Sequence, residues 1–293
     1  MALLRAPEAG TEEIDRGGCH ERLLEPWQDP WARDGDYAMA RLSILGVSVN
    51  AVDLPAAVTE MAQAIVEARQ AYVSTCPVYT LMQGHERSDV RVALNGADWV
   101  VPDGVPVVWA LRAMGARQAG RVYGPDLMLA LSELSAHKGY AQFYLGGRPG
   151  VADELAAEMR RRFPALKVAG IYSPPFRALE PTEELMMIDQ INSSGAQVVW
   201  VGLGSPKQDV WMAQYRRALK PPLLIGVGAA FDFFTGRQKQ APRWMQRSGL
   251  EWLFRLVSQP RRLWRRYLIY NPKFIFYITL QLTRLRRYDI NPE

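Results

Sequence analysis

Short apolar runs that end in glycine or proline, each followed by a helix-like stretch, recur from Leu42 to about residue 228. Six of these runs are predicted to be buried strands: YVSTC (72–76), ADWVVPDG (97–104), AQFYLGG (141–147), LKVAGIY (166–172), QVVWVGLG (197–204) and PLLIGVG (222–228). Strands and helices that alternate at this spacing are typical of βαβ units. The pattern predicts an α/β fold with a doubly wound, mostly parallel, Rossmann-like sheet, in which ligands bind beyond the carboxyl ends of the strands.

Composition divides the chain into three parts. Residues 1–40 are rich in Pro, Gly, Asp and Glu and lack extended apolar periodicity, which predicts a mostly disordered leader. Their start has no basic-then-apolar signal pattern, so we expect a cytoplasmic protein. Because 293 residues suffice for one large α/β domain, that domain is expected over residues 41–248, followed by a helical appendage over 249–293.

Residue types that build metal or nucleophilic centres are scarce. The chain has two cysteines, Cys19 and Cys76, and three histidines, none of which lies in a strand-end motif. Neither a zinc cluster nor a Ser-His-acid triad follows from these positions. Asp34 and Asp36 form an acid-x-acid pair, but no strand precedes them. The residues therefore indicate no metal site and no bound cofactor.

Positive charge is concentrated near the C-terminus. The formal net charge is +5, but residues 237–287 hold 13 Lys/Arg against one acid, Glu251. A local anionic partner is therefore expected. We expect Asn271-Pro272-Lys273 to cut the longest apolar stretch in two, so that neither part reaches the ~20 residues of a membrane-spanning helix.

Residues 261–268 separate charged from apolar side chains on a helical wheel of about 100° per residue. One face carries Arg261, Arg262, Arg265 and Arg266, and the opposite face carries Leu263, Trp264, Tyr267 and Leu268. This basic, amphipathic pattern is typical of a helix that lies on an anionic membrane surface. The alternative is a helix packed on its own domain with a solvated basic face.

Glycine-rich turns follow several of the predicted strands. The stretch GLGSPKQD (202–209) fits a phosphate site, because glycine lets backbone N–H groups approach an anion and the next helix adds its partial positive charge. An ordinary tight turn is the alternative. The stretch is not the dinucleotide fingerprint, since Lys207 occupies the third glycine's place.

Three charged residues follow other predicted strands or loops. Asp103 lies where a strand gives way to a helix, so its carboxylate either serves as a general base or caps the helix. Arg121, in a polar loop before another helix, either neutralises a phosphate or is a solvated surface residue. Asp232, in GVGAAFDFFTG (226–236), either hydrogen-bonds a sugar hydroxyl or is a turn residue.

Taken together and in order, these motifs resemble the WecG/TagA/CpsF family of bacterial glycosyltransferases over roughly residues 41–270. The matching elements are Thr75 after a strand, VVPDG with Asp103, RVYGPDLM with Arg121, FYLGG, VGLGSPKQD with Gln208, GAAFDFFTG, and APRWMQRSGLEWLFRL with its basic continuation. The family often shows Asn two residues after that threonine, where this chain has Pro77. The departure bears on the sugar contact and hence on the identity of the substrate.

The resemblance implies transfer of a sugar from a UDP-sugar to a polyprenyl-diphosphate-linked sugar, with inversion and without a metal, as in common-antigen or teichoic acid synthesis. By position, Asp103 is the expected base, and Thr75, Arg121 and Gln208 are expected to bind substrate or leaving group. The strand-end motifs add these expected substrate contacts: Gly104, Gly146, Gly147, Tyr172, Gly202, Gly204, Lys207 and Asp232. Arginines of the appendage are expected to contact the acceptor diphosphate or the membrane: Arg255, Arg261, Arg262, Arg265 and Arg266.

The expected partners are thus a UDP-sugar donor, a lipid-linked acceptor and the anionic inner face of the cell membrane, on which the protein would be peripheral. The aromatic tail could also bury itself in a homo-oligomer. Two other classes of protein compete. A basic nucleic-acid-binding protein would explain the tail but not the strand-end motifs, and a nicotinamide-dependent oxidoreductase is disfavoured by the incomplete glycine fingerprint.

Overall fold

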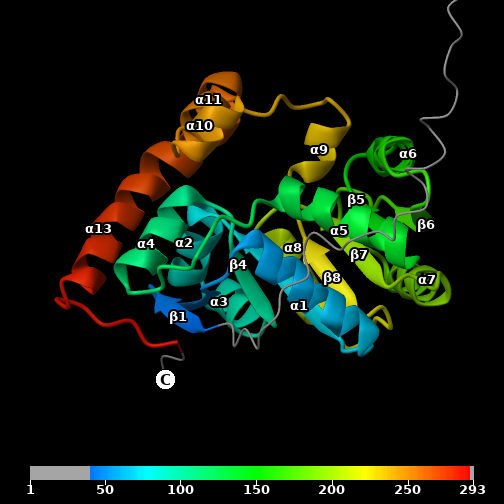
Figure 1. The fold of residues 1–293 in the computed structure, drawn as a ribbon, viewed down its shortest axis with the longest axis horizontal. Coiled ribbons are helices and arrows are strands. Elements are labelled where there is room, and N and C mark those ends of the chain that lie inside the picture. Colours follow the sequence, from blue (N-terminus) through cyan, green and yellow to red (C-terminus); the bar gives the residue numbers. More distant parts are fainter. Residues whose placement is uncertain (1–39, 291–293) are drawn as a thin grey trace, which may run out of the picture. The chain divides into compact units, whose positions relative to one another are not determined.

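The computed structural model describes residues 40–290, so the predicted leader lies, except for Ala40, outside the described residues. All six predicted strands are present: β3 (Ala71–Cys76), β4 (Trp99–Pro102), β5 (Ala141–Gly146), β6 (Lys167–Tyr172), β7 (Val198–Gly202) and β8 (Leu223–Gly226). They form one sheet in the order β4-β3-β8-β7-β5-β6, and every pairing is parallel. The prediction of a doubly wound α/β sheet is confirmed (Figure 1).

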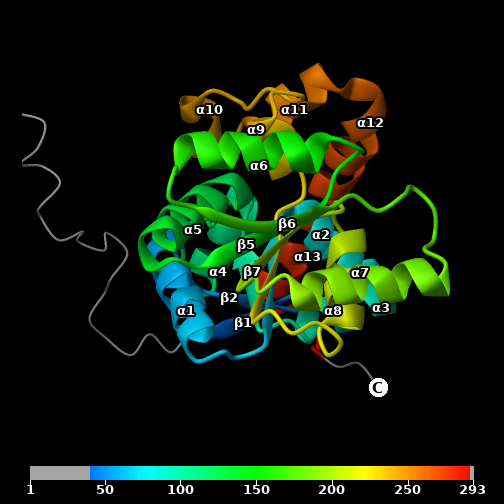
Figure 2. The ribbon, with the colours of Figure 1, turned by 90° about the vertical axis from the view of Figure 1, so that its right-hand side faces the viewer.

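Helices cover both faces of this sheet, as the apolar character of its strands requires. Figure 2 shows α5 and α6 on one side of the sheet and α7 and α8 on the other. The helices of the two faces are α1 (Leu54–Val66), α2 (Val78–Glu86), α3 (Ser88–Asn95), α5 (Gly124–Lys138), α6 (Val151–Arg162), α7 (Pro181–Ser193) and α8 (Lys207–Tyr215). β5 and β7 are neighbours in the sheet. After β5 the chain continues to β6 at the edge of the sheet, whereas after β7 it continues in the opposite direction, to β8. The carboxyl ends of β5 and β7 therefore flank the topological switch point.

An antiparallel hairpin precedes the sheet, and the sequence pattern does not single it out. Its strands are β1 (Arg41–Ile44) and β2 (Val47–Asn50). The two residues between them, Leu45 and Gly46, have φ values of 53° and 85°. A two-residue turn with positive φ at both positions suits hairpin twist, but Leu in the first position hides the usual Asn-Gly or Asp-Gly signal.

Helices continue from residue 243 to residue 282, after the last strand. They are α10 (Arg243–Arg247), α11 (Glu251–Ser258), α12 (Pro260–Trp264), the π-helical segment η2 (Arg265–Ile269) and α13 (Tyr270–Leu282). Asn271-Pro272-Lys273 interrupts the apolar stretch in sequence, but Pro272 lies inside α13 and does not end the helix. The π-helical segment η2 directly precedes α13.

The π-helical segment also divides the apolar face that the helical wheel predicts. Leu263 is buried, and the Tyr267 ring lies 6.2 Å from the Trp252 ring, whereas Trp264 and Leu268 are 44% and 55% exposed. A wheel assumes regular α turns, and η2 changes the angle between successive side chains. The apolar face is thus partly packed on the domain and partly exposed, and its contact with a membrane stays a prediction.

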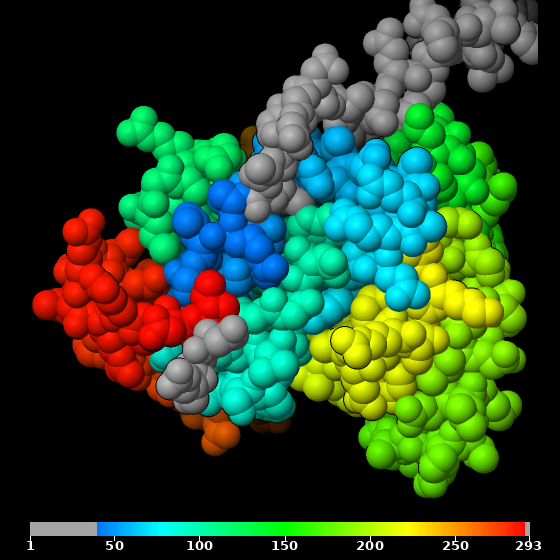
Figure 3. Space-filling view, turned by 90° about the horizontal axis from the view of Figure 1, so that it is seen from below, coloured from blue at the N-terminus to red at the C-terminus, as the bar shows by residue number. Residues whose placement is uncertain are grey.

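The last helix packs back onto the first hairpin. Phe274 and Ile278 of α13 belong to the hydrophobic core. The Gln281 side chain accepts a hydrogen bond from Leu45 N at 2.9 Å and donates one to Ser43 O at 2.6 Å. Figure 3 shows the C-terminal residues, in red, against the blue hairpin. Within residues 40–290 no helix combines the length and apolarity that crossing a membrane would require.

Candidate active site

A cavity of about 100 Å³ lies beyond the carboxyl ends of β3 and β4, between the sheet and the C-terminal helices. Asp103 and Arg121 line it from the sheet domain. Glu251, Arg255 and Arg266 line it from the C-terminal helices. The fold therefore brings together charged side chains that are far apart in sequence, at the carboxyl ends of strands that lie apart from the switch point between β5 and β7.

Asp103 follows the last residue of β4 and directly faces this cavity. The next helix, α4 (Val105–Ala113), has Gly104 at its N-cap and no side-chain cap, so the capping alternative for Asp103 is wrong. Its Oδ1 atom is buried and has no hydrogen-bond partner among the described residues. Burial raises the pKa of Asp103 to about 6, although the nearby Arg121 guanidinium acts in the opposite direction.

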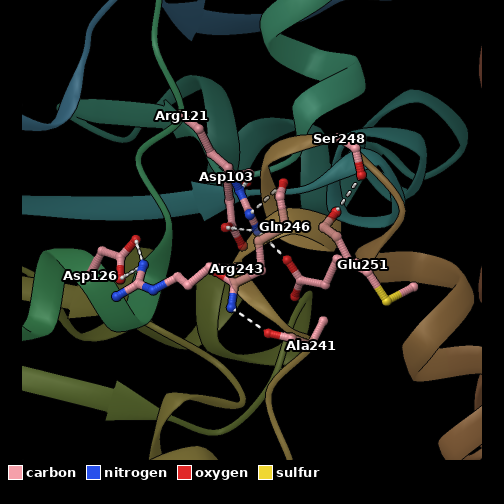
Figure 4. Close-up of polar contacts among 9 residues, drawn as sticks. Asp103, Arg121, Asp126, Ala241, Arg243, Gln246, Ser248 and Glu251 are labelled. Carbon is pink, nitrogen blue, oxygen red and sulfur yellow. Dashed lines mark hydrogen bonds and ion pairs between the residues drawn. The ribbon is translucent and has the colours of Figure 1, made fainter.

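Arg121 is held by several groups at once (Figure 4). Its Nε donates to the backbone oxygen of Asp103, and its Nη2 donates to the Glu251 carboxylate at 2.5 Å. The same Nη2 lies 3.8 Å from Asp103 Oδ1. The guanidinium carbon stands 4.1 Å from the centroid of the Tyr123 ring. With a side chain only 20% exposed, Arg121 is not the solvated surface residue of the alternative interpretation.

Glu251 is a site residue that sequence reasoning missed. It is the first residue of α11, and its side chain is 13% exposed. Its partner Arg121 lies 130 residues earlier in the chain. The charge pattern could have indicated it, because Glu251 is the single acid in residues 237–287, a segment that also holds 13 Lys/Arg. In the structure this lone acid pairs with Arg121.

The five arginines predicted to contact diphosphate or membrane divide into two groups. Arg255 and Arg266 line the cavity. Neither forms an ion pair with a carboxylate of residues 40–290; Arg255 stands over the Phe233 ring at 5.5 Å and Arg266 over the Tyr79 ring at 4.7 Å. Burial lowers the pKa of Arg266. The other three are exposed and do not line the cavity: Arg261, Arg262 and Arg265.

Thr75 and Pro77 lie near the end of β3 but differ in access to the cavity. The Thr75 hydroxyl is buried, donates to the Gly226 backbone oxygen at 2.7 Å and does not line the cavity. Pro77 does line it, at the N-cap of α2, where no side chain caps the helix. An Asn at this position could cap the helix or present an amide to a ligand, and proline can do neither.

Of the predicted glycine contacts, Gly104 lines the Asp103 cavity. The other four lie elsewhere, at the switch point between β5 and β7: Gly146, Gly147, Gly202 and Gly204. A Cβ atom on Gly146 would lie 2.6 Å from the backbone of Gly202, and one on Gly202 would lie 2.8 Å from the Phe231 ring. Gly147 and Gly204 have φ values of 76° and 80°. Close approach of the Gly202 backbone explains Gly146, close approach of the Phe231 ring explains Gly202, and left-handed backbone explains Gly147 and Gly204. Their contacts with substrate stay predictions.

The remaining predicted contacts also lie outside the lining of the Asp103 cavity. Gln208 is buried; its Oε1 accepts from Gly228 N at 3.0 Å and thereby ties two strand-end loops together. Lys207 is exposed and lines a second groove, of about 680 Å³. Asp232, in the short helix α9 (Ala230–Phe234), accepts from Gln238 at 2.6 Å. Tyr172 ends β6 and is half-buried. Their roles in substrate binding stay predictions.

A second acid, Asp209, is buried inside the sheet domain. It is fully inaccessible, and its Oδ1 accepts a hydrogen bond from the Ser74 hydroxyl at 2.5 Å. Burial raises the pKa of Asp209 to about 7. Within residues 40–290, no group of three or more His, Cys, Asp or Glu side chains is arranged to hold a metal ion. Transfer without a metal stays a prediction.

The site combines a carboxylate at a strand end of a doubly wound α/β sheet with three arginines, two of them from the C-terminal helices, which is an arrangement typical of an enzyme. Residues 42–288 match the glycosyl transferase WecG/TagA/CpsF family, and the chain belongs to that family. The protein is therefore a glycosyltransferase of cell-surface polysaccharide biosynthesis. The resemblance seen in the sequence is confirmed, and the match includes the whole of α13. Family membership, and not the basic composition, decides between the classes of protein considered above.

Proposed function

We propose that this protein transfers a hexose or N-acetylhexosamine from a UDP-sugar to a polyprenyl-diphosphate-linked sugar, with inversion and without a metal. Asp103 takes the proton of the acceptor hydroxyl as that oxygen attacks the anomeric carbon. The bond from this carbon to the UDP oxygen breaks, and UDP leaves with the negative charge. The proposal depends on one observation, a buried Asp103 carboxylate whose Oδ1 has no hydrogen-bond partner among the described residues, in a cavity with three arginines.

The electrostatics of the cavity support Asp103 as the base and the arginines as ligands of the leaving diphosphate. A base with a pKa of about 6 is ionised at neutral pH, yet it still has appreciable affinity for a proton. Arg255 and Arg266 have no carboxylate partner within the described part of the chain, so they are free to bind phosphate oxygens. The buried Tyr123 hydroxyl, likewise without a described partner, adds a donor on the cavity wall.

The exposed part of the C-terminal helices supports a peripheral position on an anionic membrane. Arg261, Arg262 and Arg265 are exposed beside Trp264 and Leu268, which combines cations with aromatic and aliphatic surface. Arg266 belongs to the same short stretch but lines the cavity. We propose that this arrangement brings the cavity close to the headgroup of the lipid-linked acceptor. Association into a homo-oligomer stays a prediction.

Product analysis tests the proposal directly. Purified protein is incubated with a panel of UDP-sugars and short-chain polyprenyl-diphosphate-linked acceptors, and the lipid product is identified by mass. We expect a mass increase of one hexosyl or N-acetylhexosaminyl group, which Asp103→Asn abolishes. Thermal unfolding in the presence of UDP, NADH or single-stranded DNA provides a second measurement. Stabilisation by UDP alone is expected, whereas stabilisation only by NADH or DNA would contradict the proposal.

A further inference from the structure

Glu251 and Asp103 share one cation. The Arg121 Nη2 atom donates to Glu251 Oε2 at 2.5 Å and lies 3.8 Å from Asp103 Oδ1, too far for a hydrogen bond. The rest of the guanidinium is restrained by the Asp103 backbone oxygen, by the Gln246 backbone oxygen at 3.5 Å and by the Tyr123 ring. Glu251 supplies the carboxylate that accepts a hydrogen bond from Nη2, on the side of the guanidinium that also lies nearest Asp103 Oδ1.

We propose that Glu251 is a positioning residue: by binding Arg121 from α11, it keeps that guanidinium from pairing directly with the Asp103 carboxylate, and so preserves Asp103 as a base. This inference rests on the proposed role of Asp103 in sugar transfer. It adds a second contribution of the C-terminal helices to the site, besides their arginines.

Removing the Glu251 charge would redirect Arg121. Nη2 would lose its anionic acceptor, and Asp103 Oδ1 is the nearest carboxylate oxygen without a hydrogen bond. A movement of roughly 1 Å would then form a charge-assisted bond between Arg121 and Asp103. Such a bond stabilises the ionised form of a carboxylate, so Asp103 would hold a proton less tightly and become a weaker base.

No other group named around Asp103 supplies the negative charge that Glu251 supplies. The cations that face the Asp103 carboxylate are Arg121, Arg255 and Arg266, and each of them lowers the pKa of Asp103. Glu251 is the acid that acts against them. The nearby uncharged groups are the Tyr123 hydroxyl and the buried Cys76 thiol, and burial raises the pKa of both. Neither therefore supplies negative charge at neutral pH.

Titration of Asp103 in the full-length protein tests the inference without relying on turnover. The protein is labelled with ¹³C at the aspartate carboxyl carbons, and the Asp103 resonance is assigned with Asp103→Asn. We expect the Asp103 midpoint to fall by at least about one pH unit in Glu251→Gln. Glu86→Gln is the matched control, because Glu86 pairs with Lys273 at 2.7 Å and links α2 to α13 away from the cavity. Its Asp103 midpoint is expected to equal that of the wild type.

Kinetics of the same variants supply the second readout. Glu251→Gln is expected to lower kcat about tenfold and to move the acidic limb of the pH profile to lower pH, whereas a merely structural loss would leave that limb in place. Glu251→Asp keeps the negative charge and is expected to restore part of kcat and part of the position of the acidic limb. This variant keeps the inference testable if Glu251→Gln folds poorly.

Two failures can be told apart. An Asp103 midpoint that is unchanged in Glu251→Gln, or that rises, would overturn the inference whatever happens to the rate. Transfer at near wild-type rate by Asp103→Asn would instead overturn the proposed function, and with it the base that Glu251 is said to preserve.

Discussion

Two acids of this protein have raised pKa values for the same reason, and yet they belong to different kinds of environment. Burial raises the pKa of Asp103 to about 6 and that of Asp209 to about 7. Asp209 lies in α8, faces β3 and accepts a hydrogen bond from the Ser74 hydroxyl. Asp103 faces a cavity, and three arginines act on its carboxylate. A raised pKa reports burial in both cases, and only access and surrounding charge indicate a site for chemistry.

Replacing the two acids by the isosteric amide is the strongest test of this contrast. Asp103→Asn is expected to lower the transfer rate by about a thousandfold or more, because the acceptor hydroxyl loses the group that takes its proton. UDP binding, measured by calorimetry, should change little, since Asp103 is not proposed to bind the nucleotide. Turnover close to wild type would remove Asp103 from the mechanism.

The next largest effect on the transfer rate is expected from replacing an arginine of the cavity, compared with replacing an arginine of the surface. Arg266→Gln removes a charge-assisted contact worth about 1.5–3 kcal/mol, so transfer to a water-soluble acceptor should fall by roughly 10- to 100-fold. Arg262→Gln, at an exposed position of the same helical run, is the matched control and should leave that rate unchanged.

Point variants suit this test better than deletion of residues 250–293. A deletion would also remove Phe274 and Ile278 from the hydrophobic core, and loss of activity would then report unfolding. Equal losses of activity in the two arginine variants would contradict the division into cavity and surface arginines.

The pH profile of kcat/KM is expected to show a smaller effect and measures the protonation of Asp103 continuously. Below a pH of about 6 Asp103 becomes protonated and can no longer accept the hydroxyl proton. The value of kcat/KM is therefore expected to fall about tenfold for each pH unit below that point and to level off above it. In stopped assays across pH 4.5 to 8, an acidic limb near pH 4 would show that Asp103 is not desolvated in the working enzyme.

Asp209→Asn should have the smallest effect on transfer, within about threefold, and a larger effect on stability. The folded pKa of Asp209, about 7, is higher than that of an unfolded aspartate. As pH rises from about 4 to about 7, the unfolded chain releases this proton first, so the wild type loses stability across that window.

The Asn variant cannot ionise. Its free energy of unfolding relative to wild type should therefore rise across the same window, by on the order of 2 kcal/mol. Urea unfolding at pH 5 and pH 8 measures this difference. A constant difference at the two pH values would show that Asp209 is ionised in the folded protein.

Local sequence signals predicted the sheet well and the C-terminal helices poorly. Each parallel strand is an apolar run closed by glycine or proline, and all six are in place. The β1–β2 hairpin was missed because Leu45 stands in its turn with φ of 53°. The wheel did not anticipate the π-helical turn of residues 265–269, because a wheel assumes regular α-helical periodicity.

The sequence by itself determined that a parallel α/β sheet forms and that a carboxylate, Asp103, stands at the end of one of its strands, because strand patterns and strand ends are local properties. Only the tertiary structure decided which distant charges meet that carboxylate. Arg121 and Glu251 are 130 residues apart, and Arg266 enters the cavity while its neighbour Arg265 stays exposed. Such choices depend on how the C-terminal helices pack across the sheet, since a change of one residue in helical register turns a side chain by about 100°.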